Sequence, residues 1–249
     1  MSEFSFLHNL FGASIYAKAL DSLARSLWII FAGWMLLVPS TVAFFVLLWA
    51  DRQKWDFAGE APLKMIWPWM AIVGALLNLY GKYSCFELRQ PLEFGQPLPG
   101  ARSLSIAFYS DMAAALIRLI ARGAWAKFRL YALPLHIAGQ IMFLLFLRKI
   151  ADVVGRHGLR RLVDFTLITF VLACVCGGTA FVLIPARANP FLFLGLGLAG
   201  LVFLICTTVA YLLALAQLAC ALGRFANYLR EPVDDDEMLK EAGLEPEGA

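Results

Sequence analysis

The chain has 249 residues, of which 61% are hydrophobic and only 16% are charged, well below the roughly 25% charged content of ordinary soluble domains. A water-soluble protein of this length interrupts its apolar runs with charges every few residues to cover its surface, and this chain does not. The composition therefore excludes an ordinary soluble domain and indicates a protein whose main solvent is lipid.

Long uncharged stretches predict an all-α, polytopic transmembrane helix bundle. An α-helix needs roughly 17 to 25 residues to cross the hydrocarbon core. Five stretches have about that length or more, and they cover residues 26–50, 65–81, 130–147 (interrupted only by His136), 165–186 and 188–223. The first one begins late and has no small-residue cleavage site before Asp51, so we expect it to remain as a membrane anchor.

The pattern divides the chain into three parts. Residues 1–25 carry apolar side chains at roughly helical spacing, which is typical of an amphipathic helix at the membrane interface; a polar tail with a few apolar residues is the alternative. Residues 26–222 form the transmembrane bundle. Residues 223–249 form an acidic cytoplasmic tail with Asp234, Asp235, Asp236 and Glu237 in a row.

We expect about six spans separated by polar loops. The predicted spans are residues 27–49, 64–81, 103–121, 130–147, 165–186 and 191–224. The last would be about 50 Å long, more than the roughly 30 Å of the hydrocarbon core, so it must tilt, project into the cytoplasm or break near its glycines. Two predicted loops are the proline-rich segment 90–100 and the basic segment 148–164. We expect the basic segment to face the cytoplasm and to start with a short interfacial helix, because apolar and basic side chains alternate along it.

Residues 103–121 have two interpretations, because Asp111 and Arg118 interrupt an otherwise apolar run. These residues are two helical turns apart and share a face, which suits either a buried polar stripe in a bundle or an interfacial helix. Loop charge favours a span, since cytoplasmic loops are rich in Lys and Arg. If residues 103–121 span the membrane, thirteen of the 21 basic residues lie on the inner side, Lys82 among them. If they do not, only ten of the 21 lie on that side. Six spans place both termini in the cytoplasm.

Three segments of the middle third resemble parts of uncharacterised bacterial multi-span inner-membrane proteins. They are FLLFLRKIADVVGRHGLRRLVD at 143–164, GKYSCFELRQP at 81–91 and the step Gly100-Ala101-Arg102. The resemblance implies a location in the inner (plasma) membrane and a helix after the proline-rich loop. It brings no known activity and assigns no functional residue.

Four polar residues within the predicted spans are candidates for an intramembrane site. Asp111 is the most informative, because an ionisable group at membrane depth is costly and is by default a functional hypothesis. Its partner is either Arg118 on the same helix or a residue of another span. His136 and Gln140 lie one turn apart on the next span. Asp111 is either part of a relay for protons or cations, or a paired residue that stabilises the bundle. His136 is either a haem ligand or a hydrogen-bonded packing histidine near Gln140.

No catalytic, cofactor or metal site can be assembled from the sequence. Gly195, Gly197 and Gly200 spell G-x-G-x-x-G, but the run is apolar and follows no strand, so we interpret these glycines as helix-packing residues. The five cysteines include no C-x-x-C pair, and none lies near a histidine ligand motif. The sequence therefore gives weak support to an enzyme and predicts no cofactor.

Two functions remain open. The interpretation that the sequence favours is a non-enzymatic membrane scaffold or complex subunit, with a protein partner at the acidic tail and anionic lipid head groups at the basic loops. The alternative is a small-solute or ion transporter that uses Asp111. Nucleic acid is not an expected partner, because the basic residues are not interleaved with exposed aromatic side chains.

Overall fold

The computed structural model describes residues 3–53, 60–87, 100–120, 129–183 and 190–228 of the chain, and within these ranges it is helical without a strand. The all-α prediction is therefore confirmed for this part of the chain. The helices are α1 (Glu3–Gln53), α2 (Glu60–Glu87), α3 (Ala101–Ile120), α4 (Arg129–Val153), α5 (His157–Leu183) and α6 (Pro190–Tyr228).

Five of the described helices contain a segment long and apolar enough to cross a membrane: Ala17–Phe44, Ala61–Glu87, Ala132–Val153, His157–Thr179 and Gly195–Tyr228. Helix α3 is not one of them, so the sixth span stays a prediction. Large apolar side chains are widely exposed on these helices, as at Met65 (74%) and Leu198 (64%). Such surfaces are unfavourable in water and are expected in lipid, so the helices have the properties of a multi-pass membrane protein.

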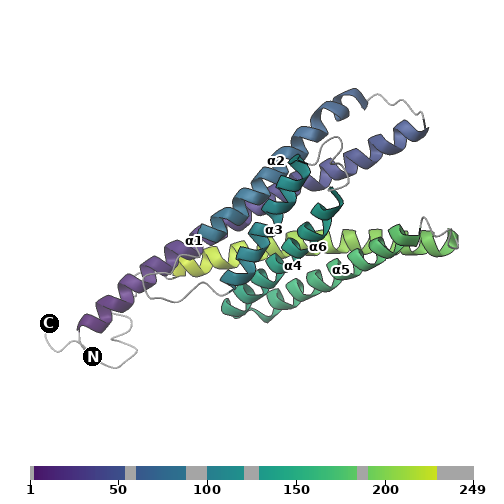
Figure 1. Ribbon diagram of the computed structural model, residues 1–249. Coiled ribbons are helices and arrows are strands. Elements are labelled where there is room, and N and C mark those ends of the chain that lie inside the picture. Colours follow the sequence, from purple (N-terminus) through teal and green to yellow (C-terminus); the bar gives the residue numbers. More distant parts are fainter. Residues whose placement is uncertain (1–2, 54–59, 88–99, 121–128, 184–189, 229–249) are drawn as a thin grey trace.

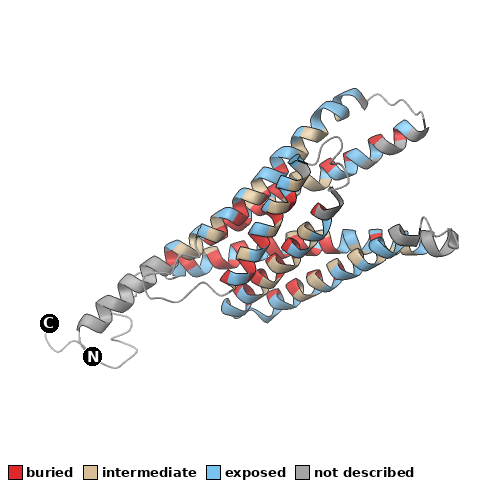
Figure 2. Cartoon of the chain, in the orientation of Figure 1, coloured by how far each residue is buried: buried red, intermediate tan, exposed pale blue. Residues whose placement is uncertain are grey.

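Consecutive helices pair as three antiparallel hairpins: α1 with α2, α3 with α4, and α5 with α6 (Figure 1). The two long hairpins meet where α1 packs against α6 and diverge toward their loops, while the shorter α3–α4 hairpin lies between them. Buried positions gather around this junction (Figure 2). The core therefore lies where the three hairpins meet, and the diverging ends of the long hairpins present mostly exposed side chains.

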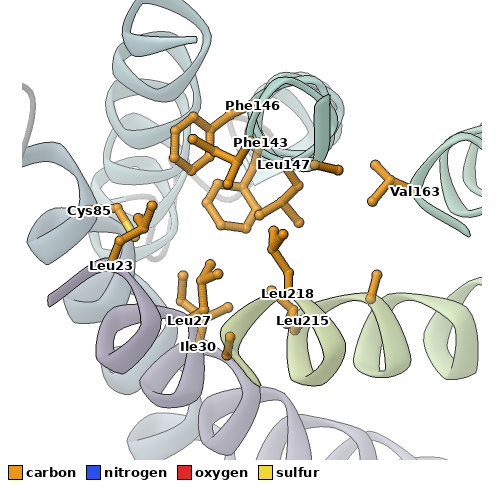
Figure 3. Packing of buried hydrophobic residues seen from close by; sticks show 14 of the residues in the cluster. Leu23, Leu27, Ile30, Cys85, Phe143, Phe146, Leu147, Val163, Leu215 and Leu218 are labelled. Atoms are coloured by element: carbon orange, nitrogen blue, oxygen red, sulfur yellow. The ribbon is translucent and has the colours of Figure 1, made fainter. Parts of the chain in front are cut away.

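The core joins helices that are far apart in the sequence. Leu27 and Ile30 of α1 face Leu215 and Leu218 of α6, and Phe143 of α4 lies above them (Figure 3). These side chains are at most 1% exposed. Tight packing at this point fixes the three hairpins relative to one another.

Glycines bring α1 and α2 into close contact. A Cβ atom at Gly33 would lie 2.8 Å from the backbone nitrogen of Asn78 and from the carbonyl oxygen of Gly74, and a Cβ at Gly74 would lie 2.8 Å from the Gly33 carbonyl oxygen. Backbone atoms cannot move aside as a flexible side chain can. The α1–α2 hairpin is therefore joined backbone to backbone, as is common for transmembrane helices with small residues at their interface.

The basic segment 148–164, which we expected to be a loop that starts with a short interfacial helix, is helical except at residues 154–156. Helix α4 continues to Val153 and α5 begins at His157, so only three residues connect them. Gly155 makes this tight turn possible, because its φ of 70° lies in the left-handed region. Arg148 and Arg160 then pair across the turn with Asp164 (2.9 Å) and Asp152 (3.1 Å), which ties the two helices together.

The helices are longer than the predicted spans, and α1 and α6 are the longest of them. Helix α1 is continuous, so the predicted boundary between residues 25 and 26 is not the end of a helix. Helix α6 has 39 residues and runs unbroken through its glycines, which excludes the predicted alternative of a break there. At 1.5 Å per residue it is about 58 Å long, which exceeds the roughly 30 Å of the hydrocarbon core. The two remaining alternatives are that α6 tilts in the membrane or that it projects into the cytoplasm. The proline-rich segment 90–99 and the acidic residues from 229 onward lie outside the described residues.

Candidate functional site

Three ionisable side chains from three helices meet inside the bundle. Asp111 of α3 is 9% exposed, and each of its carboxylate oxygens has a partner on another helix. Lys82 of α2 donates a hydrogen bond to Oδ2, and Nδ1 of His136 on α4 lies 2.8 Å from Oδ1. The cluster therefore links the α3–α4 hairpin to the α1–α2 hairpin through side chains rather than through the backbone.

Gly139 of α4 makes room for the carboxylate. A Cβ atom at this position would lie 2.7 Å from Oδ1 of Asp111 and 3.2 Å from the carbonyl oxygen of Ala107. Any larger residue would push α3 away from α4. Because His136 lies one turn before Gly139, the same close approach brings its ring within hydrogen-bonding distance of Asp111.

Lys82 is the residue that sequence reasoning missed. We counted it among the charges of the inner side, directly after the predicted end of span 2 at residue 81, but α2 continues to Glu87 and Lys82 is 1% exposed within the bundle. Its Nζ lies 4.9 Å from the centroid of the Phe143 ring, at a distance suited to a cation–π contact. A signal was present, because the residues after Lys82 are mostly uncharged and Lys82 lies one helical turn after Asn78.

The hydrogen bond to Asp111 defines the state of the His136 ring. An ionised carboxylate only accepts hydrogen bonds, so Nδ1 carries the hydrogen and the neutral ring has its lone pair on Nε2. The side chain is 36% exposed, whereas Lys82 and Asp111 are enclosed. His136 is therefore the most exposed member of the cluster.

The structure brings together two of the four candidate residues. Asp111 and His136 are bonded to each other, so the hydrogen-bond partner of His136 is Asp111, and the choice between a functional and a packing role for His136 stays open. Gln140 is 4% exposed and follows Gly139, and its Nε2 has no hydrogen-bond partner among the described residues. The side chain of Arg118 lies outside the described part, so its pairing with Asp111 stays a prediction. Lys82 of α2 and His136 of α4 are the partners that the structure shows for the two carboxylate oxygens of Asp111.

The described residues contain no group of three or more His, Cys, Asp or Glu side chains that could hold a metal ion, and the five cysteines are free thiols. Comparison with known protein families, curated proteins and solved structures finds no match for this chain. The buried cluster is therefore the feature from which a function can be argued.

Proposed function

We propose that this protein is a proton-coupled transporter of small solutes in the inner (plasma) membrane, with Lys82, Asp111 and His136 as its proton-binding site. The observation that carries the proposal is the enclosed carboxylate shared between a lysine and a histidine of two other helices. Ionisable residues at membrane depth commonly mark proton relays and substrate pathways.

Stability alone gives little reason for such a cluster. Placing a Lys or an Asp at the centre of a membrane helix costs about 2.5 to 3.5 kcal/mol on insertion scales. Replacing a buried ion pair by apolar side chains of similar volume is often neutral or stabilising. A bundle that needed only a tight junction could therefore use leucines, as it does around Leu215 and Leu218.

The geometry supports a simple coupling mechanism. When Nε2 of His136 takes up a proton, the imidazolium becomes a second cation beside Asp111 and competes with Lys82 for the carboxylate. Lys82 belongs to α2 and His136 to α4, so protonation shifts the balance of attraction between two hairpins. The α3–α4 hairpin packs mostly within itself and less extensively against α2 and α5, so the charge cluster lies at one of the weaker contacts between the hairpins.

The scaffold interpretation depends on other residues. Its central element, the acidic tail beyond residue 229, lies outside the described part of the chain. It therefore stays a prediction with its own test, and the charge cluster favours transport.

Proton-coupled uptake into proteoliposomes tests the proposal. The vesicles contain a pH-sensitive dye at pH 7.5 and are placed at pH 6.0, and small carboxylates, amino acids, sugars and organic amines are added in turn. We expect one class to acidify the interior faster than in protein-free vesicles. Asp111→Asn and His136→Gln should abolish the effect, because each removes a proton-exchanging group.

Arg25→Gln is the matched control, because Arg25 pairs with Asp21 of its own helix and is 73% exposed. This variant should retain uptake. A folded Asp111→Asn protein with uptake equal to the parent would contradict the proposal, and so would a parent protein that responds to none of the four solute classes.

A further inference from the structure

Buried polar atoms without partners surround the charge cluster. Apart from Arg148 Nε, which pairs with Asp164, five such atoms have no hydrogen-bond partner among the described residues: Trp34 Nε1, Asn78 Oδ1, Gln140 Nε2, Thr207 Oγ1 and Tyr211 Oη. The Asn78, Gln140, Thr207 and Tyr211 side chains are at most 7% exposed. Native proteins rarely leave such atoms unpaired, and in hydrocarbon no solvent can pair them.

These atoms are distributed around one region of the junction. The rings of Trp34 and Tyr211 pack edge to face with centroids 5.2 Å apart, and Thr207 lies one turn from Tyr211 on α6. The backbone of Asn78 touches Gly33, the residue next to Trp34. The indole N–H of Trp34 and the phenol oxygen of Tyr211 are neighbours that interact weakly with each other, and neither makes a hydrogen bond of normal geometry within the described residues.

The region is continuous with the proton-binding site. Lys82 follows Asn78 by one turn of α2, and Gln140 follows Gly139, the residue that packs against Asp111. A ligand held by the unpaired atoms would therefore lie close enough to the cluster to interact with its charge.

The chemistry of the unpaired atoms indicates what they bind. The Trp34 and Gln140 nitrogens can only donate, the Tyr211 and Thr207 hydroxyls can donate, and the Asn78 oxygen accepts. A set dominated by donors matches a group with several acceptor atoms. When His136 is protonated the cluster carries a net positive charge, which in a medium of low dielectric constant attracts an anion. Both features fit a carboxylate.

We propose that Trp34, Asn78, Gln140, Thr207 and Tyr211 bind a small monocarboxylate beside the protonated Lys82–Asp111–His136 cluster. This inference rests on the proposed function, because the bound anion and the proton on His136 compensate each other and would cross the membrane together without net charge. It adds the substrate class and the residues that recognise it.

Calorimetric titration of the purified full-length protein in lipid nanodiscs tests the site, with propionate, lactate and propionamide as probes. We expect both carboxylates to bind at pH 5.5 and to bind at least tenfold more weakly at pH 8.0, because the anion is proposed to bind together with a proton. Propionamide has the shape of propionate without its charge and should not bind measurably.

Tyr211→Phe removes a single hydroxyl and should weaken propionate binding about tenfold, in line with the loss of one hydrogen bond to a charged group. Tyr80→Phe is the matched control, because Tyr80 is 57% exposed on α2, and it should bind as the parent does. Thr207→Val preserves side-chain size and should also weaken binding, which keeps the test valid if Tyr211→Phe fails to fold.

Three results would overturn the inference: no carboxylate binding by the parent, equal binding by a folded Tyr211→Phe or Thr207→Val protein, or equal binding of propionamide. Uptake of another solute class with protons, without carboxylate binding, would refute this site and leave the proposed function standing. Carboxylate binding without proton-coupled uptake would support this binding site and refute the proposed function.

Discussion

Removing the cation of the buried ion pair provides a direct test of its energetics. Lys82→Met keeps much of the length and apolar character of the side chain but leaves the Asp111 carboxylate without its lysine. Both side chains are enclosed, with 1% and 9% exposed. Breaking a buried pair by deleting one partner costs about 3 to 5 kcal/mol, because an uncompensated charge stays behind. We expect the free energy of unfolding to fall by about that amount at pH 8.

The assay is reversible unfolding in mixed micelles of mild and denaturing detergent, followed by circular dichroism. The double variant Lys82→Met/Asp111→Asn removes both charges and should recover most of the loss, because no buried ion is left.

Arg25→Met serves as the control for losing a positive charge. It breaks the exposed pair with Asp21 within α1 and should cost at most about 1 kcal/mol. The reasoning fails if Lys82→Met is no more destabilising than Arg25→Met, or if the double variant is as unstable as Lys82→Met alone.

Three further predictions follow from the packing, the topology and the tail. Gly74→Ala should destabilise the protein by about 1 to 3 kcal/mol in the same unfolding assay, because its Cβ would clash with the backbone of α1. Gly178→Ala is the control: its Cβ would have nothing within 4 Å among the described residues, so it should stabilise α5 by up to about 1 kcal/mol. Reporter fusions at the two ends of the chain should both report the cytoplasm, and a cysteine at Gly158 should resist impermeant reagents in intact cells; opposite locations of the two ends would exclude six spans. If the tail binds a protein partner, deletion of residues 231–249 should abolish co-purification of that partner without altering solute uptake, and unchanged co-purification would refute the scaffold interpretation.

The turn between α4 and α5 shows where sequence reasoning reaches its limit. Charged residues at 148–164 indicated a loop, because charge at the end of an apolar run marks the membrane boundary. The helices instead continue past that boundary, and Arg148 and Arg160 are accommodated by aspartates across the turn. Hydropathy locates where a helix leaves the hydrocarbon, but local turn geometry at Gly155 decides where the helix ends.

The sequence by itself determined the helical class and the position of the long apolar segments, and it singled out Asp111 and His136 as candidate residues. These features depend on composition and on the cost of placing an ionisable group among apolar residues, which act locally along the chain. Only the tertiary structure decided which groups surround Asp111. Lys82 is 29 residues away from Asp111 and His136 is 25 away, and they meet because Gly139 admits the carboxylate and because α2, α3 and α4 converge at the junction. A contact between side chains of different helices depends on the packing of those helices, which no local pattern of residues encodes.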